Sequence, residues 1–127
     1  MTINLAQLAE EVAAALRAYS IPEAPAPGQV GEPLPPEWYT ASLARMQASL
    51  VSPYWIDIRA DGPLSSAPVI LKRIAVVADD GDGSLVGFDP EGEFVLAVRA
   101  QDPDTTRGID VVFCGVRGDV VGCFLSR

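Results

Sequence analysis

The chain of 127 residues contains no histidine, and this absence removes several chemistries at once. Serine and cysteine nucleophiles are most often activated by a neighbouring histidine, and histidine is also the commonest metal ligand. The only cysteines are Cys114 and Cys123, and two thiolates without histidine do not complete a structural zinc site. We therefore expect no metal, no cofactor and no enzymatic activity of the common hydrolase types.

Basic residues are scarce as well. Nine lysine and arginine side chains face seventeen acidic ones, which gives a net charge of −8. Because affinity for nucleic acid is supplied largely by basic side chains, we expect no nucleic-acid partner and favour a protein partner with a basic surface. Lys72 is the only lysine, and this excess of arginine is typical of a GC-rich bacterial source.

Long apolar runs are missing too. No segment approaches the ~20 apolar residues that a membrane-spanning helix needs. Residues 1–20 lack the basic start and the continuous apolar core of a secretory signal. We expect a cytoplasmic protein with no membrane partner.

The length predicts one domain over residues 1–127, with two helices in its first half. Asn4 is a helix cap before a stripe of apolar residues at spacings of three and four, which predicts a helix over residues 4–19. Residues 21–36 hold six prolines and two glycines and read as a connector. A second helix is predicted over residues 37–50, with Pro53 ending it and a buried stripe formed by Trp38, Tyr39, Leu43, Met46 and Leu50.

The second half reads as strands. Residues 54–60 alternate, residues 69–78 are nearly all apolar, and residues 84–100 form a hairpin around the turn Asp89-Pro90-Glu91-Gly92. Two more apolar runs, residues 109–116 and 119–125, are separated by Arg117-Gly118, which predicts a final hairpin. We therefore expect an α+β fold, with two N-terminal helices packed on a mainly antiparallel sheet of five or six strands.

The final hairpin carries a specific packing prediction. Its register places Phe113 opposite Gly122 and Phe124 opposite Val111. Cys114 and Cys123 then lie diagonally on the other face, too far apart for a disulfide. Both faces are apolar, so this hairpin either belongs inside the sheet or carries a partner interface.

An acidic segment lies around the central hairpin. Six carboxylates with no basic residue among them are the predicted partner-binding residues: Asp79, Asp80, Asp82, Asp89, Glu91 and Glu93. Asp80, Asp82, Ser84 and Glu91 stand at positions 1, 3, 5 and 12 of a calcium-loop template, but Leu85 replaces its essential glycine and no helices flank it. We favour an exposed acidic loop over a calcium site. Exposed carboxylates also lack the desolvation that acid–base catalysis needs, so we expect no enzyme.

Two further segments carry a family resemblance. Leu34-Pro35-Pro36-Glu37-Trp38-Tyr39 opens the second helix, and Ile74-Ala75 precedes the glycine-rich turn and strand that end at Asp89. This arrangement resembles the SUKH superfamily, and the resemblance covers roughly half of the chain. Many bacterial members are immunity proteins that bind and neutralise toxins, so the resemblance implies an inhibitor here.

Together these observations predict a small, acidic, non-catalytic protein-binding domain, with an immunity-type inhibitor of a bacterial toxin as its specific form. Its partner would be a cognate toxin or another protein with a basic surface. Two alternatives stay open: an assembly module that uses the apolar C-terminal hairpin, and a calcium-dependent binding domain.

Overall fold

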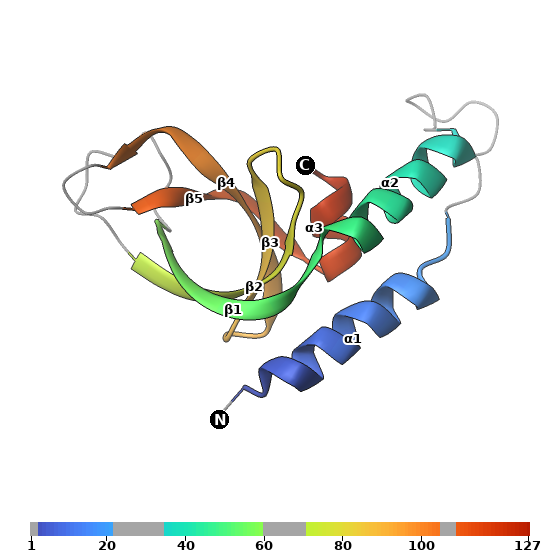
Figure 1. The fold of residues 1–127 in the computed structure, drawn as a ribbon, viewed down its shortest axis with the longest axis horizontal. Helices are drawn as coiled ribbons and strands as arrows, with labels where there is room; N and C mark the ends of the chain where they lie inside the picture. The colour runs from blue at the N-terminus through green and yellow to red at the C-terminus, as the bar shows by residue number, and fades with distance from the viewer. Residues whose placement is uncertain (1–2, 22–34, 60–70, 105–108) are drawn as a thin grey trace.

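The computed structural model describes residues 3–21, 35–59, 71–104 and 109–127, which form three helices and five strands (Figure 1). In chain order these are α1 (Leu5–Ala18), α2 (Pro36–Ser49), β1 (Leu50–Arg59), β2 (Leu71–Asp79), β3 (Ser84–Asp89), β4 (Glu93–Asp104), β5 (Ile109–Gly118) and α3 (Val120–Leu125).

The five strands close into a barrel in the order of the chain. Each strand is antiparallel to the next, and β1 closes on β5 in a parallel pair at Arg59 and Val112. A run of five alternating strands begins and ends in the same direction, so parallel closure follows from the odd number. The predicted α+β class with an antiparallel sheet is confirmed, and the closure of that sheet is the feature the sequence did not reveal.

The two N-terminal helices lie close to where they were predicted. Asn4 caps α1, and its side chain accepts a hydrogen bond of 3.1 Å from the Gln7 amide. The side chain of Gln7 donates to Glu11, so only half of a capping box forms. Pro36 begins α2 after Pro35, and the connector residues 22–34 lie outside the described residues.

Two details of the second helix differ from expectation. Of the predicted stripe only Met46 is fully buried, while Trp38, Tyr39 and Leu43 are half-buried. Pro53 does not end the helix, because the chain has already entered β1 at Leu50. Pro53 lies instead where the register of β1 against β2 shifts, a position at which a strand tolerates proline.

The central hairpin forms as predicted. Strands β3 and β4 pair from Ser84 with Val98 to Asp89 with Glu93. The Gly92 amide donates to the Asp89 carbonyl at 2.8 Å, and Gly92 has φ +118°, which favours glycine. Within β3, a side chain at Gly87 would clash with the side chain of buried Ile74, which favours glycine at this position.

The prediction of a C-terminal hairpin is wrong. β5 continues through Arg117 to Gly118, and the following residues form α3 instead of a strand. The side chain of Asp119 accepts a hydrogen bond of 2.9 Å from the Gly122 amide and so caps the helix. Residues 119–125 therefore do not pair with residues 109–116 as strands. The expected diagonal placement of Cys114 and Cys123 on one face of that hairpin does not occur either. Cys123 is buried instead, and its thiol donates a hydrogen bond of 3.5 Å to the Phe94 carbonyl.

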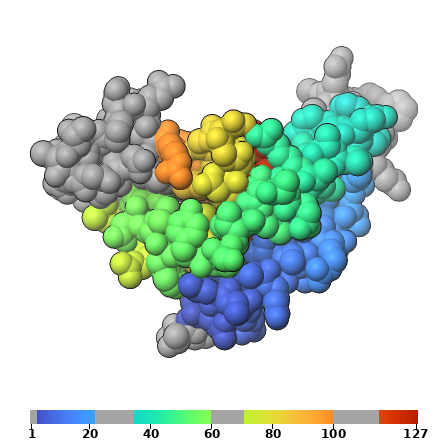
Figure 2. All heavy atoms as spheres, in the orientation of Figure 1, coloured from blue at the N-terminus to red at the C-terminus, as the bar shows by residue number. Residues whose placement is uncertain are grey.

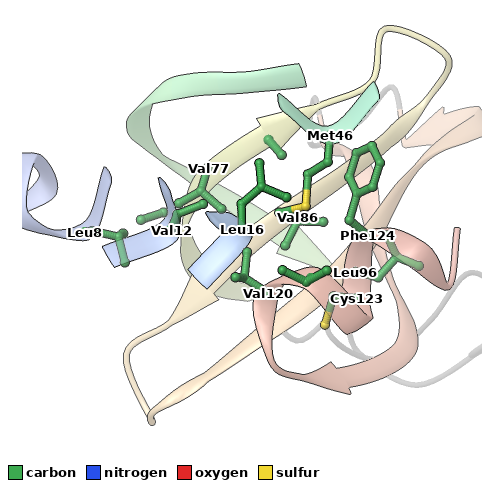
Figure 3. Close-up of a cluster of buried hydrophobic side chains, with 13 residues drawn as sticks. Leu8, Val12, Leu16, Met46, Val77, Val86, Leu96, Val120, Cys123 and Phe124 are labelled. Atoms are coloured by element: carbon green, nitrogen blue, oxygen red, sulfur yellow. The ribbon is translucent and has the colours of Figure 1, made fainter. Parts of the chain in front are cut away.

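Helix α3 is short, and burial explains why it forms. Six residues do not sustain a helix in water, but four of these six pack into the core: Val120, Val121, Cys123 and Phe124. Figure 3 shows this helix with α1 and α2 over Val77, Val86 and Leu96 of the sheet. An apolar C-terminal hairpin that could serve as an interface is therefore absent, and the assembly-module alternative loses its surface.

The barrel buries apolar side chains on both faces. One cluster joins the three helices to the strand face beneath them. A second cluster comes from the opposite face of the same strands, with Ile58, Ile74, Val76, Leu85, Val95 and Ala97 as its buried members. Among the described residues no helix is long and apolar enough to cross a membrane.

Candidate partner-binding site

The six predicted carboxylates do not form one surface. Asp79, Asp80 and Asp82 belong to the connection between β2 and β3, which we call the β2–β3 loop (residues 79–83). The other three belong to the β3–β4 turn (residues 89–93) at the opposite end of β3 (Figure 1). β3 has six residues, and at about 3.3 Å per residue the two groups lie roughly 17 Å apart along the strand.

The β2–β3 loop is folded by its own carboxylates. Oδ1 of Asp79 accepts from the Gly81 amide at 2.9 Å, and Oδ1 of Asp80 accepts from the amides of Asp82 and Ser84 at 2.8 and 3.0 Å. The Asp80 amide in turn donates to the Ser84 carbonyl at 3.1 Å. This sequence of Asp and Gly forms such turns because aspartate bonds the backbone ahead of it and glycine adopts positive φ. The loop is therefore fixed from within.

Three arginines from distant parts of the chain surround this loop. Arg99 of β4 lies 3.5 Å from Oδ2 of Asp79, and Arg127 lies 3.2 Å from Oδ2 of Asp80. Arg45 of α2 pairs with Asp82 and donates to the Asp80 carbonyl at 3.3 Å. Figure 2 shows the loop, in yellow, at the surface beside α2.

The three loop carboxylates differ in exposure. The side chain of Asp80 is only 3% exposed, whereas that of Asp82 is 70% exposed. Burial by itself raises the pKa of Asp80, but the amides of Asp82 and Ser84 and the charges of Arg127 and Arg45 outweigh it, so the pKa lies below the ordinary value. Asp80 is thus a structural anion, and Asp82 is the carboxylate that the loop displays.

The β3–β4 turn is built around a buried ion pair. Asp89 is fully buried, and its Oδ2 lies 2.6 Å from Nζ of Lys72 and 3.5 Å from the guanidinium of Arg117. Its Oδ1 accepts from the Glu91 amide at 3.0 Å. Burial alone raises the pKa of Asp89, yet the close ion pair with Lys72, the hydrogen bond from the Glu91 amide and the charge of Arg117 together hold the pKa below its ordinary value. The close contact of its ammonium with the carboxylate of Asp89 correspondingly raises the pKa of Lys72.

The same two cations extend to the exposed acids of the turn. Lys72 lies 3.0 Å from Glu91, and Arg117 lies 3.5 Å from Glu93. The side chains of Glu91 and Glu93 are 76% and 51% exposed. The turn therefore displays these two carboxylates and hides Asp89.

The expectation of six exposed carboxylates is corrected in two ways. Asp80 and Asp89 are buried, so neither can contact a docked partner directly. All six are also paired with cations that sequence reasoning missed: Arg45, Lys72, Arg99, Arg117 and Arg127. These cations lie 10 or more residues away along the chain from their acidic partners, and no local pattern indicates such pairs.

The geometry does not assemble a calcium loop. Glu91 lies at the far end of β3 from Asp80 and Asp82, and the carboxylate of Asp80 already binds two amides and Arg127. Over the described ranges, no group of three acidic or sulfur-bearing side chains is arranged to hold a metal ion. Nor is Asp89 suited to act as a general acid, because its cations keep it ionised.

Comparisons of the chain with protein-family models, with curated proteins and with solved structures find no significant match. The resemblance to the SUKH superfamily therefore stays a prediction.

Proposed function

We propose that this protein is a non-catalytic binding domain that recognises a basic protein surface through its exposed carboxylates, with Asp82 as the principal contact. The observation that carries the proposal is that the three aspartates of the β2–β3 loop have different roles. The carboxylates of Asp79 and Asp80 accept hydrogen bonds from backbone amides of the loop. Asp82 extends from the loop, and 70% of its side chain is exposed. Glu91 and Glu93 supply a secondary acidic site at the other end of β3.

A prefolded loop suits recognition because little conformational entropy remains to be lost on binding. In the β2–β3 loop, three backbone amides donate hydrogen bonds to carboxylates of the loop itself. The Arg99 amide also donates to the Gly83 carbonyl at 2.8 Å. Asp82 is therefore displayed in one position before a partner arrives.

The pairing of Asp82 with Arg45 does not prevent recognition. Both side chains are largely exposed, at 70% and 44%, and ion pairs of this kind contribute only about 0–1 kcal/mol. A lysine or arginine of a partner can replace Arg45 at low cost. Asp80, by contrast, stays bound to its amides throughout.

Inhibition of a bacterial toxin is the specific form of this proposal, and its support is the SUKH resemblance together with the net charge of −8. The proposal includes a cytoplasmic location. The protein encoded beside this chain's gene is the partner to test first. We expect its expression alone to arrest growth of a bacterial host, and co-expression of this chain to restore growth. A neighbouring product that stays toxic in the presence of this chain contradicts inhibition.

The binding surface is tested with purified proteins of that pair. We expect Asp82→Asn to slow association several-fold at low salt and to reduce the salt dependence of the association rate, because a screened charge has been removed. Asp57→Asn is the matched control, since Asp57 is also an exposed acid paired with an exposed arginine, Arg73, but lies on β1. Equal association rates for the two variants would rule out Asp82 as the contact.

A further inference from the structure

A second feature of the molecule lies where α2 meets α3. A cavity of about 200 Å³ is lined there by residues of both helices and by one residue beyond the end of α3: Trp38, Ser42, Phe124, Leu125 and Arg127. Its volume equals roughly seven water molecules at about 30 Å³ each. Asp82 and the other exposed acids are not among the lining residues, so the cavity is separate from the proposed partner site.

Arg127 is held in a fixed position at this cavity. Its Nη1 lies 3.2 Å from Oδ2 of Asp80, and its guanidinium lies 4.3 Å from the ring centre of Phe124. The side chain is 22% exposed, and its carboxylate partner is 3% exposed. A guanidinium has five N–H donors in a rigid plane. Among the described residues only Nη1 meets an acceptor, so the remaining donors are left for a ligand.

The other lining residues supply a hydroxyl and apolar surface. No hydrogen bond of the Ser42 hydroxyl is found within the described part of the chain, so this group is also open to a ligand. Trp38 is half-buried and packs edge-on against Tyr39 at 5.0 Å between ring centres. The lining of the cavity is mainly polar, and Trp38 and Leu125 add a small apolar area next to the cation.

We propose that this cavity binds a small carboxylate that carries an apolar or aromatic body. A carboxylate matches the unused edge of the Arg127 guanidinium in a bidentate pair and can accept from the Ser42 hydroxyl. The apolar body then packs on Trp38 and Leu125. A phosphate fits less well, because its second charge would find no further cation among the lining residues and Asp80 already offsets part of the charge of Arg127.

The test uses 3-phenylpropionate as the probe and Trp38 fluorescence as the readout. The chain has two tryptophans, so Trp55→Phe leaves Trp38 as the single reporter. We expect saturable binding with a dissociation constant on the order of 1 mM, as is usual for a ligand of this size. The neutral amide, 3-phenylpropionamide, should bind at least about tenfold more weakly because it loses the charged pair.

Two arginine variants in the Trp55→Phe background locate the site. Arg127→Gln should weaken binding of 3-phenylpropionate about tenfold. Arg99→Gln makes the same charge change at an arginine that also pairs with the β2–β3 loop but does not line the cavity, and should leave binding unchanged. Asp82→Asn should leave it unchanged as well, which separates failure of this site from failure of the proposed partner site.

Several outcomes would overturn the proposal: no saturation at about 10 mM probe, equal binding of acid and amide, or equal binding by the two arginine variants. If Arg127→Gln lowers the melting temperature so far that it does not fold, Ser42→Leu fills the cavity without touching the ion pair, and its retention of full affinity would also refute the site. Tighter binding of acetyl-Gly-Phe than of 3-phenylpropionate supports the same site with a peptide C-terminus as the source of the carboxylate.

Discussion

The two connections on either side of β3 are both rich in aspartate and glutamate, yet they use these residues differently. In the β2–β3 loop, the carboxylate of Asp80 is satisfied mainly by backbone amides, with Arg127 beside it. In the β3–β4 turn, the carboxylate of Asp89 accepts a hydrogen bond from one amide, that of Glu91. Its charge is balanced mainly by Lys72 and Arg117. Asp82 and Glu91 each pair with a cation as well, but most of their side chains are exposed.

The partner of each carboxylate, and not its place in an acidic run, determines its role. An amide can be satisfied by any oxygen acceptor, including the neutral oxygen of asparagine. Cations packed against a buried carboxylate, as Lys72 and Arg117 are, lose their counter-charge when that carboxylate becomes an amide. Substitution by asparagine therefore distinguishes the two kinds of site.

The largest effect on stability is expected at Asp89. Asp89→Asn keeps an oxygen for the Glu91 amide but leaves Lys72 and Arg117 without their buried counter-charge. Breaking a fully buried pair costs about 3–5 kcal/mol, and since Lys72 is 24% exposed and keeps Glu91, we expect about 2–3 kcal/mol. Urea unfolding of the variant measures this. A loss below about 0.5 kcal/mol would contradict the buried-pair description.

Acid should remove the same stabilisation from the unmodified protein. The folded pKa values of Asp80 and Asp89 lie below their unfolded values. The stabilisation is therefore fully present above the unfolded pKa of about 4 and is lost as the pH falls through the folded pKa values. At about pH 6 we expect Asp89→Asn to be less stable than the wild type. This difference in unfolding free energy should shrink by about 2 kcal/mol once the pH lies below the folded pKa of Asp89. A difference independent of pH would show that the charge of Asp89 is not the cause.

At Asp80 the comparison predicts a smaller loss that depends on the substitute. Asp80→Ala removes the acceptor of two amides and should cost about 1–2 kcal/mol. Asp80→Asn keeps that acceptor and should cost less than Asp80→Ala, because only the pair with Arg127 is weakened. Equal losses from the two variants, measured by urea unfolding, would mean that the arginine matters more than the backbone hydrogen bonds.

The smallest effects are expected at the displayed acids. Asp82→Asn and Glu91→Gln each remove an exposed charge whose partner is itself in contact with water. We expect each to change the unfolding free energy by less than about 0.5 kcal/mol. A loss of about 2 kcal/mol from either variant would assign it a structural role like that of Asp89 and would weaken the proposal that it contacts a partner.

Local signals in the sequence were sufficient for α1 and for the central hairpin. Asn4 and the spacing of Leu8, Val12 and Leu16 place the helix within a residue of its observed ends. The turn from Asp89 to Gly92 sets the register of β3 on β4 because its own residues determine its geometry. In both cases the interactions that define the element lie within a few residues of one another.

The run after Gly118 shows where such signals fail. Val120, Val121 and Phe124 are apolar and suit either a strand or a short helix, since their spacing does not distinguish the two. The predicted strand includes Asp119, although an aspartate before an apolar run is also typical of a helix cap. Packing against Met46, Val86 and Leu96 favours the helix over the strand. None of these three residues is close to residues 119–125 in the chain.

Composition and short-range geometry suffice to predict the class of this protein, its capped first helix, its central hairpin and the absence of histidine chemistry. Tertiary structure decided the closure of the barrel, the helical form of the C-terminus and the state of every acidic residue in the candidate site. The physical reason is that closure, burial and ion pairing join residues far apart in the chain. Asp89 meets Lys72 and Arg117 only when β2 and β5 flank the central hairpin, and only then does one aspartate become a buried anion while Asp82 remains at the surface.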